Sequence, residues 1–589
     1  MSAQKTPLQR LWGFHKRFYR HRRQLIPGLL AVPLVAICDI WLTVVFGNSL
    51  TRLREGSDAE FLAGVFVLLL AISAVGGLFR FFQRWLLVGV SRRFEVDLKR
   101  ELFQKLCRLP LRFHARSRSG DIVSRSTSDI ENLRMLLGPG LLMYVLSAFV
   151  MVPGALFIMF GISVKVTLSM MLPLVITGVA MKLLSPRIHR ASIEVQESLG
   201  DLSHRAQESF AGIRVIKGYG LQKHEQEDFE KFSKDNRDHQ LEMASARGLM
   251  HSFVNLSFDM TSLPILFVGG LGMIDRNLNV GDLFKFIDLT AKVFWPVIAL
   301  GWMAGLFPRA VVSATRIEEV LDEDLHIDDP EHPIPLDPVR GELSLKRVGF
   351  TYDGESEPAL KAIDVEIPAG TTLGVVGPTG SGKSTLLNLI GRLLEAEGRI
   401  ELDGIGIRDL SLDTLRGATA YVPQDSFLFS DSYRRNLEFG AAHELGDETL
   451  AELIELAGMT EEVAQFEHGL EQMIGERGVT LSGGQRQRTC IARALARKPR
   501  ILILDDALSA VDTETEVKLK RSLRRAGQGR TVILSAHRLA TVRDAENIVV
   551  LKRGEIEAQG THEEVLKLSS WYRDTWDRQR MQDELEQLQ

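Results

Sequence analysis

The chain has 589 residues and a formal net charge of −4, so it lacks the excess of basic residues that nucleic-acid-binding proteins carry. This length predicts more than one domain. Its cysteines, Cys38, Cys107 and Cys490, are too few and too far apart for a disulfide framework or a metal-binding motif. Apolar runs are concentrated in the first half of the chain, and the second half has the composition of a soluble α/β protein.

Residues 1–23 are predicted to form an amphipathic elbow helix. Leu11, Trp12 and Phe14 are interleaved with basic residues such as Lys16 and Arg17, a pattern typical of helices that lie on a membrane surface. The stretch has no apolar core followed by a small-residue cleavage site, which argues against a signal peptide.

A transmembrane domain is predicted over residues 24–310. Six apolar segments are each long enough to cross about 30 Å of hydrocarbon. The two longest loops between them are rich in Lys and Arg, which places these loops and both chain ends in the cytoplasm. The segments lie near residues 24–47, 61–80, 136–160, 164–184, 249–273 and 283–308.

The two long loops are predicted to continue the membrane helices into the cytoplasm. Each contains a helix breaker where the chain can turn back, Leu109–His114 in the first and Phe210–Arg214 in the second. We interpret these turns as two cytoplasmic tips that contact the soluble domain; the alternative is that they are ordinary solvated turns.

Several ionisable residues fall within the predicted spans, where such groups usually face a bundle interior or a water-filled cavity. Lys285, Asp288 and Lys292 are spaced to neutralise one another along one helix. Asp39 and Asp259 have no such local partner and are the better candidates for a cavity.

Residues 311–340 combine several prolines with acidic residues and are predicted to be a linker. A soluble domain is predicted over residues 341–575. The remaining residues, 576–589, are expected to be a charged, solvated tail.

The stretch TTLGVVGPTGSGKSTL, residues 371–386, predicts a strand, a Gly-rich loop and a helix. Its glycines, Lys383 and Ser384 satisfy the G-x-x-x-x-G-K-[ST] pattern of a P-loop, in which backbone N–H groups and the lysine bind the phosphates of a nucleoside triphosphate. The hydroxyl of Ser384 is a predicted Mg²⁺ ligand. The nucleotide-binding residues predicted here are Gly377, Pro378, Thr379, Gly380, Ser381, Gly382, Lys383, Ser384 and Thr385.

A second part of this site is predicted downstream. Ile501 to Leu504 form an apolar strand that ends at Asp505. In this order after a P-loop, Asp505 is expected to hold Mg²⁺.

The run Leu481-Ser482-Gly483-Gly484-Gln485 lies between these motifs, and it resembles the signature sequence of ATP-binding cassette (ABC) ATPases. The whole chain resembles an ABC exporter half-transporter: an all-α six-helix transmembrane domain with long cytoplasmic extensions, followed by an α/β P-loop nucleotide-binding domain. The resemblance implies that Tyr352 stacks on adenine and that Gln424 reaches Mg²⁺ and the attacking water. It also implies that His537 is the switch histidine at the γ-phosphate, and that Ser509–Asp512 form the D-loop. It also matches Gly475–Gly478 to a segment that meets the cytoplasmic helices.

In the family, the signature of one cassette closes on ATP held by the P-loop of another, so the resemblance implies a dimer with a second half-transporter. Ser482, Gly483, Gly484 and Gln485 would then contact the partner's nucleotide. The expected cofactors are ATP and Mg²⁺. The expected setting is the lipid of a cell membrane, most simply a bacterial inner membrane, with no nucleic acid as partner.

One position departs from the family pattern. The residue after Asp505 is usually the glutamate that acts as general base or orients water, and here it is Asp506. Its side chain is one methylene shorter, so the site on this P-loop is predicted to hydrolyse ATP slowly, and a heterodimer with a competent partner is favoured. A homodimer in which Asp506 suffices, an exporter-fold importer and an ATP-gated channel remain alternatives, and the cargo is not encoded in any motif.

Overall fold

The computed structural model describes residues 6–441, 443–475, 478, 480–511, 513–526 and 529–587. The chain divides into two compact units. The membrane unit comprises Met1–Leu106 and Ser119–Asp322, and the cassette unit comprises Cys107–Arg118 and Glu323–Gln589.

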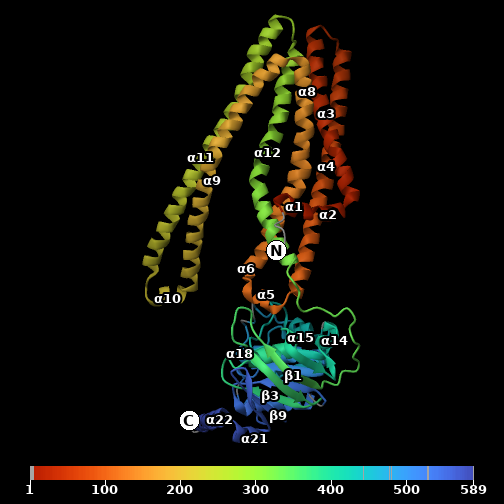
Figure 1. Ribbon diagram of the computed structural model, residues 1–589. Coiled ribbons are helices and arrows are strands. Elements are labelled where there is room, and N and C mark those ends of the chain that lie inside the picture. The colour runs from red at the N-terminus through yellow and green to blue at the C-terminus, as the bar shows by residue number, and fades with distance from the viewer. Residues whose placement is uncertain are drawn as a thin grey trace. The chain divides into compact units, whose positions relative to one another are not determined.

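Long helices build the membrane unit (Figure 1). Among the described residues, five helical stretches are long and apolar enough to cross a membrane: Arg22–Arg54 (α3), Ala59–Arg108 (α4), Ser119–Ile162, Gln222–Ile274 (α11) and Val280–Leu321 (α12). The predicted span 164–184 lies in the continuous helix α9, Val164–Ala211, whose first part, Val164–Pro173, is apolar.

The predicted span 136–160 begins with an irregular helix. The stretch Ser119–Ile162 contains two π-helical segments, which often mark functional or closely packed positions. Gly138 faces Ser91 of α4 and Gly140 faces Met303 of α12 so closely that an added Cβ would clash with either side chain. The segments in order are α6 (Ser119–Ser124), η1 (Arg125–Asp129), α7 (Ile130–Met135), η2 (Leu136–Val145) and α8 (Leu146–Ile162).

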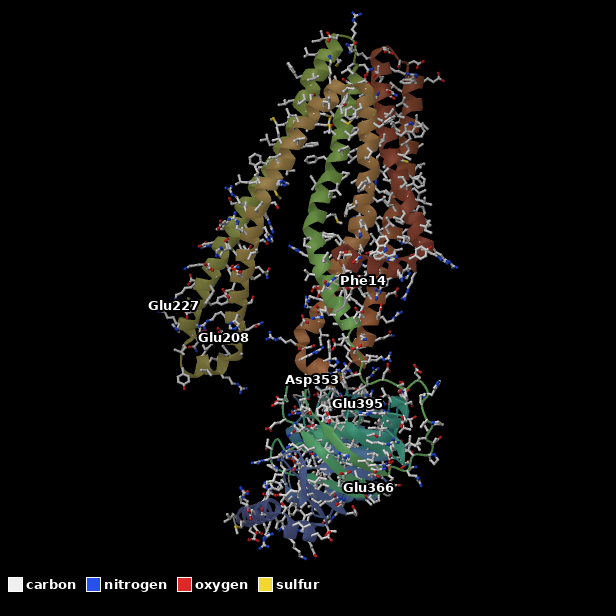
Figure 2. The ribbon with its side chains drawn as sticks, viewed as in Figure 1. Phe14, Glu208, Glu227, Asp353, Glu366 and Glu395 are labelled. Atoms are coloured by element: carbon white, nitrogen blue, oxygen red, sulfur yellow. The ribbon has the colours of Figure 1, made fainter. Side chains whose placement is uncertain are left out.

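The N-terminal elbow consists of α1, Pro7–Gly13, and α2, His15–Tyr19. Arg17 donates two hydrogen bonds of 2.8 and 2.7 Å to the carboxylate of Glu101 on α4, and Phe18 stacks on Phe94 at 4.3 Å between ring centroids. Phe14 is almost completely buried (Figure 2). The elbow is therefore packed against α4 along one face.

α9 and α11 lie side by side as a long hairpin whose turn is α10, Ile213–Gly218 (Figure 1). Arg205 on α9 pairs with Glu225 on α11 at 2.8 Å, and Asn236 donates to Ser198 at 2.9 Å. The predicted second tip is thus the short helix α10.

Among the ionisable residues of the predicted spans, Asp39 pairs across helices, whereas Lys285, Asp288 and Lys292 form ion pairs within α12. Asp39 on α3 accepts a 2.6 Å hydrogen bond from Arg80 on α4, so it is not the unpartnered group that its local sequence suggested. Lys292 pairs with Asp288 at 2.7 Å as its spacing predicts, and also donates to Thr43 of α3 at 2.5 Å. Lys285 pairs with Asp282 rather than Asp288, and Asp259 is exposed.

The predicted first tip is a short helix, α5, Leu111–Arg116, which belongs to the cassette unit. Arg108 pairs with Asp328 at 2.8 Å, and Arg116 pairs with Glu323. Arg112 lies 3.5 Å from Asp353 (Figure 2), and Phe113 is buried. Three arginines at and just before this tip, Arg108, Arg112 and Arg116, therefore contact acidic residues of the linker and of the loop after β1.

The boundaries between elements differ from the sequence-based ones in two places. α12 continues to Leu321, so the first part of the predicted linker is helical, and the irregular stretch starts only at Asp322. The last helix, α22, runs from Ser570 to Gln587 without a break at residue 576.

The cassette unit contains two sheets. The first is antiparallel with the order β2-β1-β4-β5, and the second has the order β10-β9-β3-β8-β7-β6, with five parallel strands from β9 to β6. The strands are β1 (Leu343–Phe350), β2 (Leu360–Ile367), β3 (Thr372–Val376), β4 (Glu397–Leu402), β5 (Ile405–Gly406), β6 (Thr419–Val422), β7 (Ile501–Asp505), β8 (Thr531–Ser535), β9 (Asn547–Lys552) and β10 (Glu555–Gly560).

Helices pack on this sheet to enclose two apolar cores. One core joins the helix after the P-loop to both sheets, and the other joins the parallel sheet to the helices around α18. The described helices of the unit are α13 (Lys383–Ile390), α14 (Leu412–Ala418), α15 (Tyr433–Ala441), α16 (Asp447–Leu456), α17 (Thr460–Ala464), η3 (Gly469–Glu471), α18 (Gly483–Ala496), α19 (Thr513–Ala526), α20 (Leu539–Val542), α21 (His562–Leu568) and α22.

Candidate nucleotide-binding and hydrolysis site

Three neighbouring parallel strands bring the predicted site together. β3 ends before the P-loop, β7 ends at Asp505, and β8 ends at Ser535. Because β3 pairs with β8 and β8 pairs with β7, all three carboxyl ends lie at one edge of the sheet. This edge is where open α/β sheets bind ligands.

The P-loop backbone requires glycine at its first position. Gly377 has φ of +153°, and a Cβ there would lie 2.1 Å from the carbonyl oxygen of Leu551. The loop leads into α13, whose N-terminal turn contains Ser384 and Thr385. Within the loop the hydroxyl of Ser381 is buried with no hydrogen-bond partner among the described residues. A buried hydroxyl without a partner beside a helix N-terminus fits a phosphate-binding loop.

Lys383 lies inside this loop. Its ammonium group is 2.9 Å from the carbonyl oxygen of Gly377 and 3.1 Å from that of Pro378, and it donates to both. Burial lowers the pKa of Lys383, and the nearby carboxylates of Asp506 and Asp505 oppose that shift. The lysine is thus held close to the loop and to both carboxylates, where the phosphates of a nucleotide are expected.

Asp505 is held by three hydroxyl groups. Ser384 donates to its Oδ1 at 3.1 Å, Ser535 donates to the same atom at 2.7 Å, and Tyr421 donates to Oδ2 at 3.2 Å. The hydroxyl and carboxylate oxygens of Ser384 and Asp505 are the hard ligands that Mg²⁺ prefers. These residues therefore fit the predicted metal site, with Ser535 and Tyr421 orienting the carboxylate.

Asp506 follows in a strained conformation. Its φ is +48°, its side chain is 8% exposed, and its backbone N–H donates to Ser535 Oγ at 3.0 Å. Its Oδ1 accepts from the backbone N–H of His537 at 3.4 Å. A non-glycine residue in the left-handed region costs free energy and is common at active sites. The geometry brings the predicted base close to the loop that carries the predicted switch histidine.

The signature residues start helix α18. Ser482 Oγ accepts from the backbone N–H of Gln485 at 3.2 Å, and the Gln485 side chain accepts from the backbone N–H of Ser482 at 2.9 Å, so the two form a capping box. A Cβ on Gly484 would lie 2.7 Å from the carbonyl oxygen of Ala510. Packing against the D-loop within the same cassette therefore also requires glycine at this position.

Other predicted residues are placed as follows. Tyr352 is 43% exposed, and its hydroxyl lies 3.0 Å from Thr385 Oγ1 at the end of the P-loop. Gln424 is exposed just after β6, and no side-chain hydrogen bond is found for it among the described residues. Asp512, and Glu476 and Arg477 within the predicted segment Gly475–Gly478, lie outside the described residues.

The structure adds residues that sequence reasoning missed. Tyr421 and Ser535 bind the Asp505 carboxylate, and Gln487 links α18 to the D-loop. The Gln487 side chain accepts from the N–H of Ala510 at 2.9 Å and donates to Ser509 Oγ at 3.2 Å. Each of these residues lies close to a recognised motif in the sequence, and this proximity is the feature that could have identified them.

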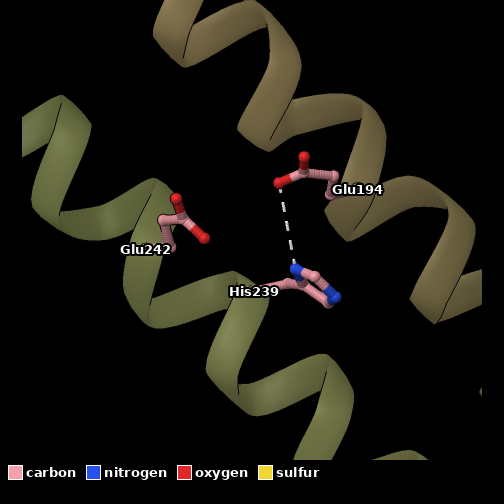
Figure 3. Close-up of side chains that lie close together, drawn as sticks. All are labelled: Glu194, His239 and Glu242. Atoms are coloured by element: carbon pink, nitrogen blue, oxygen red, sulfur yellow. Dashed lines mark ion pairs between the residues drawn. The ribbon is translucent and has the colours of Figure 1, made fainter.

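A separate group of possible metal ligands lies on the α9–α11 hairpin. Glu194, His239 and Glu242 have ligand atoms within 4.8 Å of one another, and His239 Nδ1 is 3.9 Å from Glu194 (Figure 3). His239 is also 3.7 Å from Asp235. Both glutamates are exposed, and exposed carboxylates beside a histidine readily form such pairs without a metal, so we assign no metal to this group.

Two family descriptions match the sequence. Residues 25–297 match the ABC transporter transmembrane region, and residues 360–509 match the ABC transporter family. The chain is similar to "Multidrug resistance-like ATP-binding protein MdlA" of Escherichia coli (strain K12), with 33% identity over 97% of this chain and 96% of the relative. It is 31% identical to "ATP-dependent lipid A-core flippase" of Mannheimia succiniciproducens, over 93% of this chain and 94% of the relative.

A solved structure agrees with these relatives. The fold is similar to that in "Structure of a bacterial Atm1-family ABC exporter with ATP bound", with a TM-score of 0.77, 26% identity, and coverage of 95% of this chain and 98% of that one. The similarity to this one structure therefore covers both units of the chain. The cassette is an ABC-type ATPase domain that binds ATP. The chain belongs to the ABC transporter family and is an exporter half-transporter, with one transmembrane region fused to one ATP-binding cassette.

Proposed function

We propose that this chain is one subunit of an ATP-driven exporter of amphipathic small molecules or lipids. The observation that carries the proposal is a P-loop brought together with Asp505 and Asp506, in one chain with membrane-length helices. Relatives named for multidrug resistance and for lipid A-core flipping support an amphipathic cargo. The basic long loops support a cytoplasmic location for both chain ends, and the bacterial relatives support an inner membrane.

The proposal assigns Mg²⁺ to Ser384 and Asp505. Their oxygens lie 3.1 Å apart, and Tyr421 and Ser535 fix the carboxylate from the other side. Gln424 and the residues Ser482 to Gln485 are proposed to complete the site when nucleotide and a second cassette are present. The metal, when bound, neutralises charge on the phosphate oxygens.

The proposal assigns the partner as a different half-transporter. Asp506 stands where the family usually has glutamate, and its carboxylate is held close to the protein backbone by its contact with the N–H of His537. A positioned base contributes roughly 10²–10⁴-fold to rate, so a carboxylate that is one methylene too short gives a slow site. This chain's P-loop then mainly holds ATP, while its signature serves the partner's faster site.

The experiment is to reconstitute the purified chain alone in proteoliposomes and to measure ATP hydrolysis for the wild type, Asp506→Glu and Asp506→Asn. We expect slow wild-type turnover, and an increase of at least about tenfold in Asp506→Glu. Brisk turnover of the wild type that Asp506→Asn abolishes would instead establish a homodimer with a competent aspartate.

Transport is tested in membrane vesicles that contain the complete dimer. ATP-dependent accumulation of a fluorescent amphiphilic dye in inside-out vesicles supports export, and the Lys383→Ala variant is the matched control because its P-loop lacks the phosphate-binding ammonium group. Accumulation only in vesicles of the opposite orientation would establish import.

A further inference from the structure

The C-terminal helix carries a contact that the transport function does not explain. Gln579, on α22, lies against the loop that joins β8 to α20 and contains His537, called the switch loop below. Its side-chain oxygen accepts a 2.8 Å hydrogen bond from the backbone N–H of Leu539, and its side-chain nitrogen donates a 3.0 Å hydrogen bond to the carbonyl oxygen of His537. One amide side chain thus binds the backbone on both sides of Arg538.

The two hydrogen bonds determine the orientation of the Gln579 amide. The backbone N–H of Leu539 requires an acceptor, and the carbonyl of His537 requires a donor, so only one assignment of the amide oxygen and nitrogen satisfies both. Leu539 is the first residue of α20, where backbone N–H groups have no partner within the helix. Gln579 therefore acts as a long-range cap for α20.

The backbone of His537 also forms a hydrogen bond with Asp506, on the side of the predicted hydrolysis site. The backbone N–H of His537 donates to Asp506 Oδ1 at 3.4 Å, and its carbonyl oxygen accepts from Gln579. The backbone of His537 is thus bound at its N–H by the predicted base and at its C=O by the C-terminal helix. Movement of Gln579 would therefore change the hydrogen bonds of the switch-loop backbone directly.

Aromatic packing fixes α22 at the right place for this contact. Tyr572 is fully buried and its hydroxyl lies 2.8 Å from His562 Nδ1, while Trp576 packs on the same histidine at 4.5 Å between ring centroids. Tyr572, Trp576 and Gln579 are spaced i, i+4 and i+7, so they share one face of the helix. Gln582 lies one turn further on and is exposed.

We propose that Gln579 is a positioning residue for His537, and that the C-terminal helix sets the orientation of the switch loop during ATP hydrolysis. The proposal rests on the role assigned to His537 in the ATPase function. It predicts that loss of the Gln579 amide loosens the loop and slows turnover, and leaves ATP binding at the P-loop unchanged.

The first test measures the loop itself, without reference to activity. Hydrogen exchange of the peptide covering residues 536–542 is compared in the full-length wild type, Gln579→Met, Gln579→Glu and Gln582→Met, all in detergent. We expect faster exchange of the Leu539 amide in Gln579→Met by about fivefold or more, no change in Gln582→Met, and an intermediate value in Gln579→Glu, which keeps the acceptor but not the donor.

The second test measures catalysis in the Asp506→Glu background, which is expected to have the faster site. Gln579→Met should lower kcat by about fivefold, with the dissociation constant of a fluorescent ATP analogue within twofold of its parent, and Gln582→Met should change neither. If Asp506→Glu does not raise turnover, the slow-site assignment fails while the exchange result still decides the contact of Gln579.

Three outcomes would overturn the proposal. The first is equal protection of Leu539 in the wild type and Gln579→Met. The second is equal loss of protection in Gln579→Met and Gln582→Met, which would mean that α22 detaches as a whole. The third is a parallel loss of ATP affinity and kcat, which would place the effect at the P-loop.

Discussion

The nucleotide site and the charged groups of the predicted spans are assembled in different ways. In the cassette unit, the P-loop places Lys383 and Ser384 next to each other, and one strand end supplies Asp505 and Asp506. In the membrane unit, Asp39 on α3 pairs with Arg80 on α4. The first arrangement depends on short motifs and the second on helix packing.

This difference has a physical cause. A phosphate-binding loop uses backbone N–H groups, so its residues must be close in sequence. A charge at membrane depth needs a partner because its desolvation is costly, and any helix that packs nearby can supply one. Motifs therefore identify the first kind of site, and only the three-dimensional structure identifies the second.

Removal of the P-loop ammonium group should have the largest effect. Lys383→Ala removes the cation held against the P-loop carbonyls, and we expect ATPase activity to fall by at least about 100-fold. The measurement is phosphate release by the purified chain in the Asp506→Glu background, where this P-loop supplies the activity, with Lys361→Ala as a control because Lys361 lies on β2 and pairs with Glu555. Retention of more than a tenth of the activity would show that the lysine is dispensable.

Disruption of the Asp39–Arg80 pair should have the next largest effect, on the stability of the protein. Asp39→Leu leaves Arg80 without its 2.6 Å partner, and we expect a loss of about 2–3 kcal/mol of stability. Thermal unfolding in detergent checks this value. The double variant Asp39→Leu, Arg80→Leu should recover most of the loss, and additive effects of the two substitutions would show that the pair is not coupled.

A smaller effect is expected at Tyr421. Tyr421→Phe removes the donor to Asp505 Oδ2 and leaves the bonds from Ser384 and Ser535 in place. Groups that orient a metal ligand are worth about tenfold or more in metal affinity, so the Mg²⁺ concentration needed for half-maximal ATPase should rise by about tenfold. Titration of Mg²⁺ at saturating ATP measures it; an unchanged Mg²⁺ requirement would contradict the assigned role.

The smallest expected effect is a pH dependence at His562. Burial lowers the pKa of His562 below its usual value of 6.5, and Arg543 adds to the shift. The unfolded chain then binds the proton more readily, so this contribution is complete above pH 6.5 and is lost as pH falls through the folded-state pKa.

Thermal unfolding between pH 7.5 and pH 5.5 measures the contribution of His562. His562→Gln should flatten the pH dependence, whatever its effect on stability at neutral pH. The same slope in both proteins would assign the pH dependence to other groups.

The amino-acid sequence already indicated the nucleotide site in considerable detail. The P-loop, Asp505 and Asp506 lie together as their motifs predicted, and the comparisons confirm the family that LSGGQ indicated. The functional assignments of the individual site residues stay predictions. Tyr421 and Gln487 were missed because they lie beside motifs without belonging to them, and their partners lie 84 and 23 residues away in the chain.

The contacts of the C-terminal tail could not be predicted from its local sequence. Its charged composition suggested solvation, but Trp576 packs on the core and Gln579 binds the switch loop, 40 and 42 residues earlier in the chain. The apolar face of α22 is narrow, so most residues of this helix are the charged and polar ones of its exposed side.

The sequence by itself determined the class of the protein, its nucleotide chemistry and the unusual Asp506, because phosphate binding requires contiguous residues. Tertiary structure alone decided the partners of Asp39, Asp505 and Gln579, because hydrogen bonds and ion pairs form between whichever groups the folded helices and strands bring together.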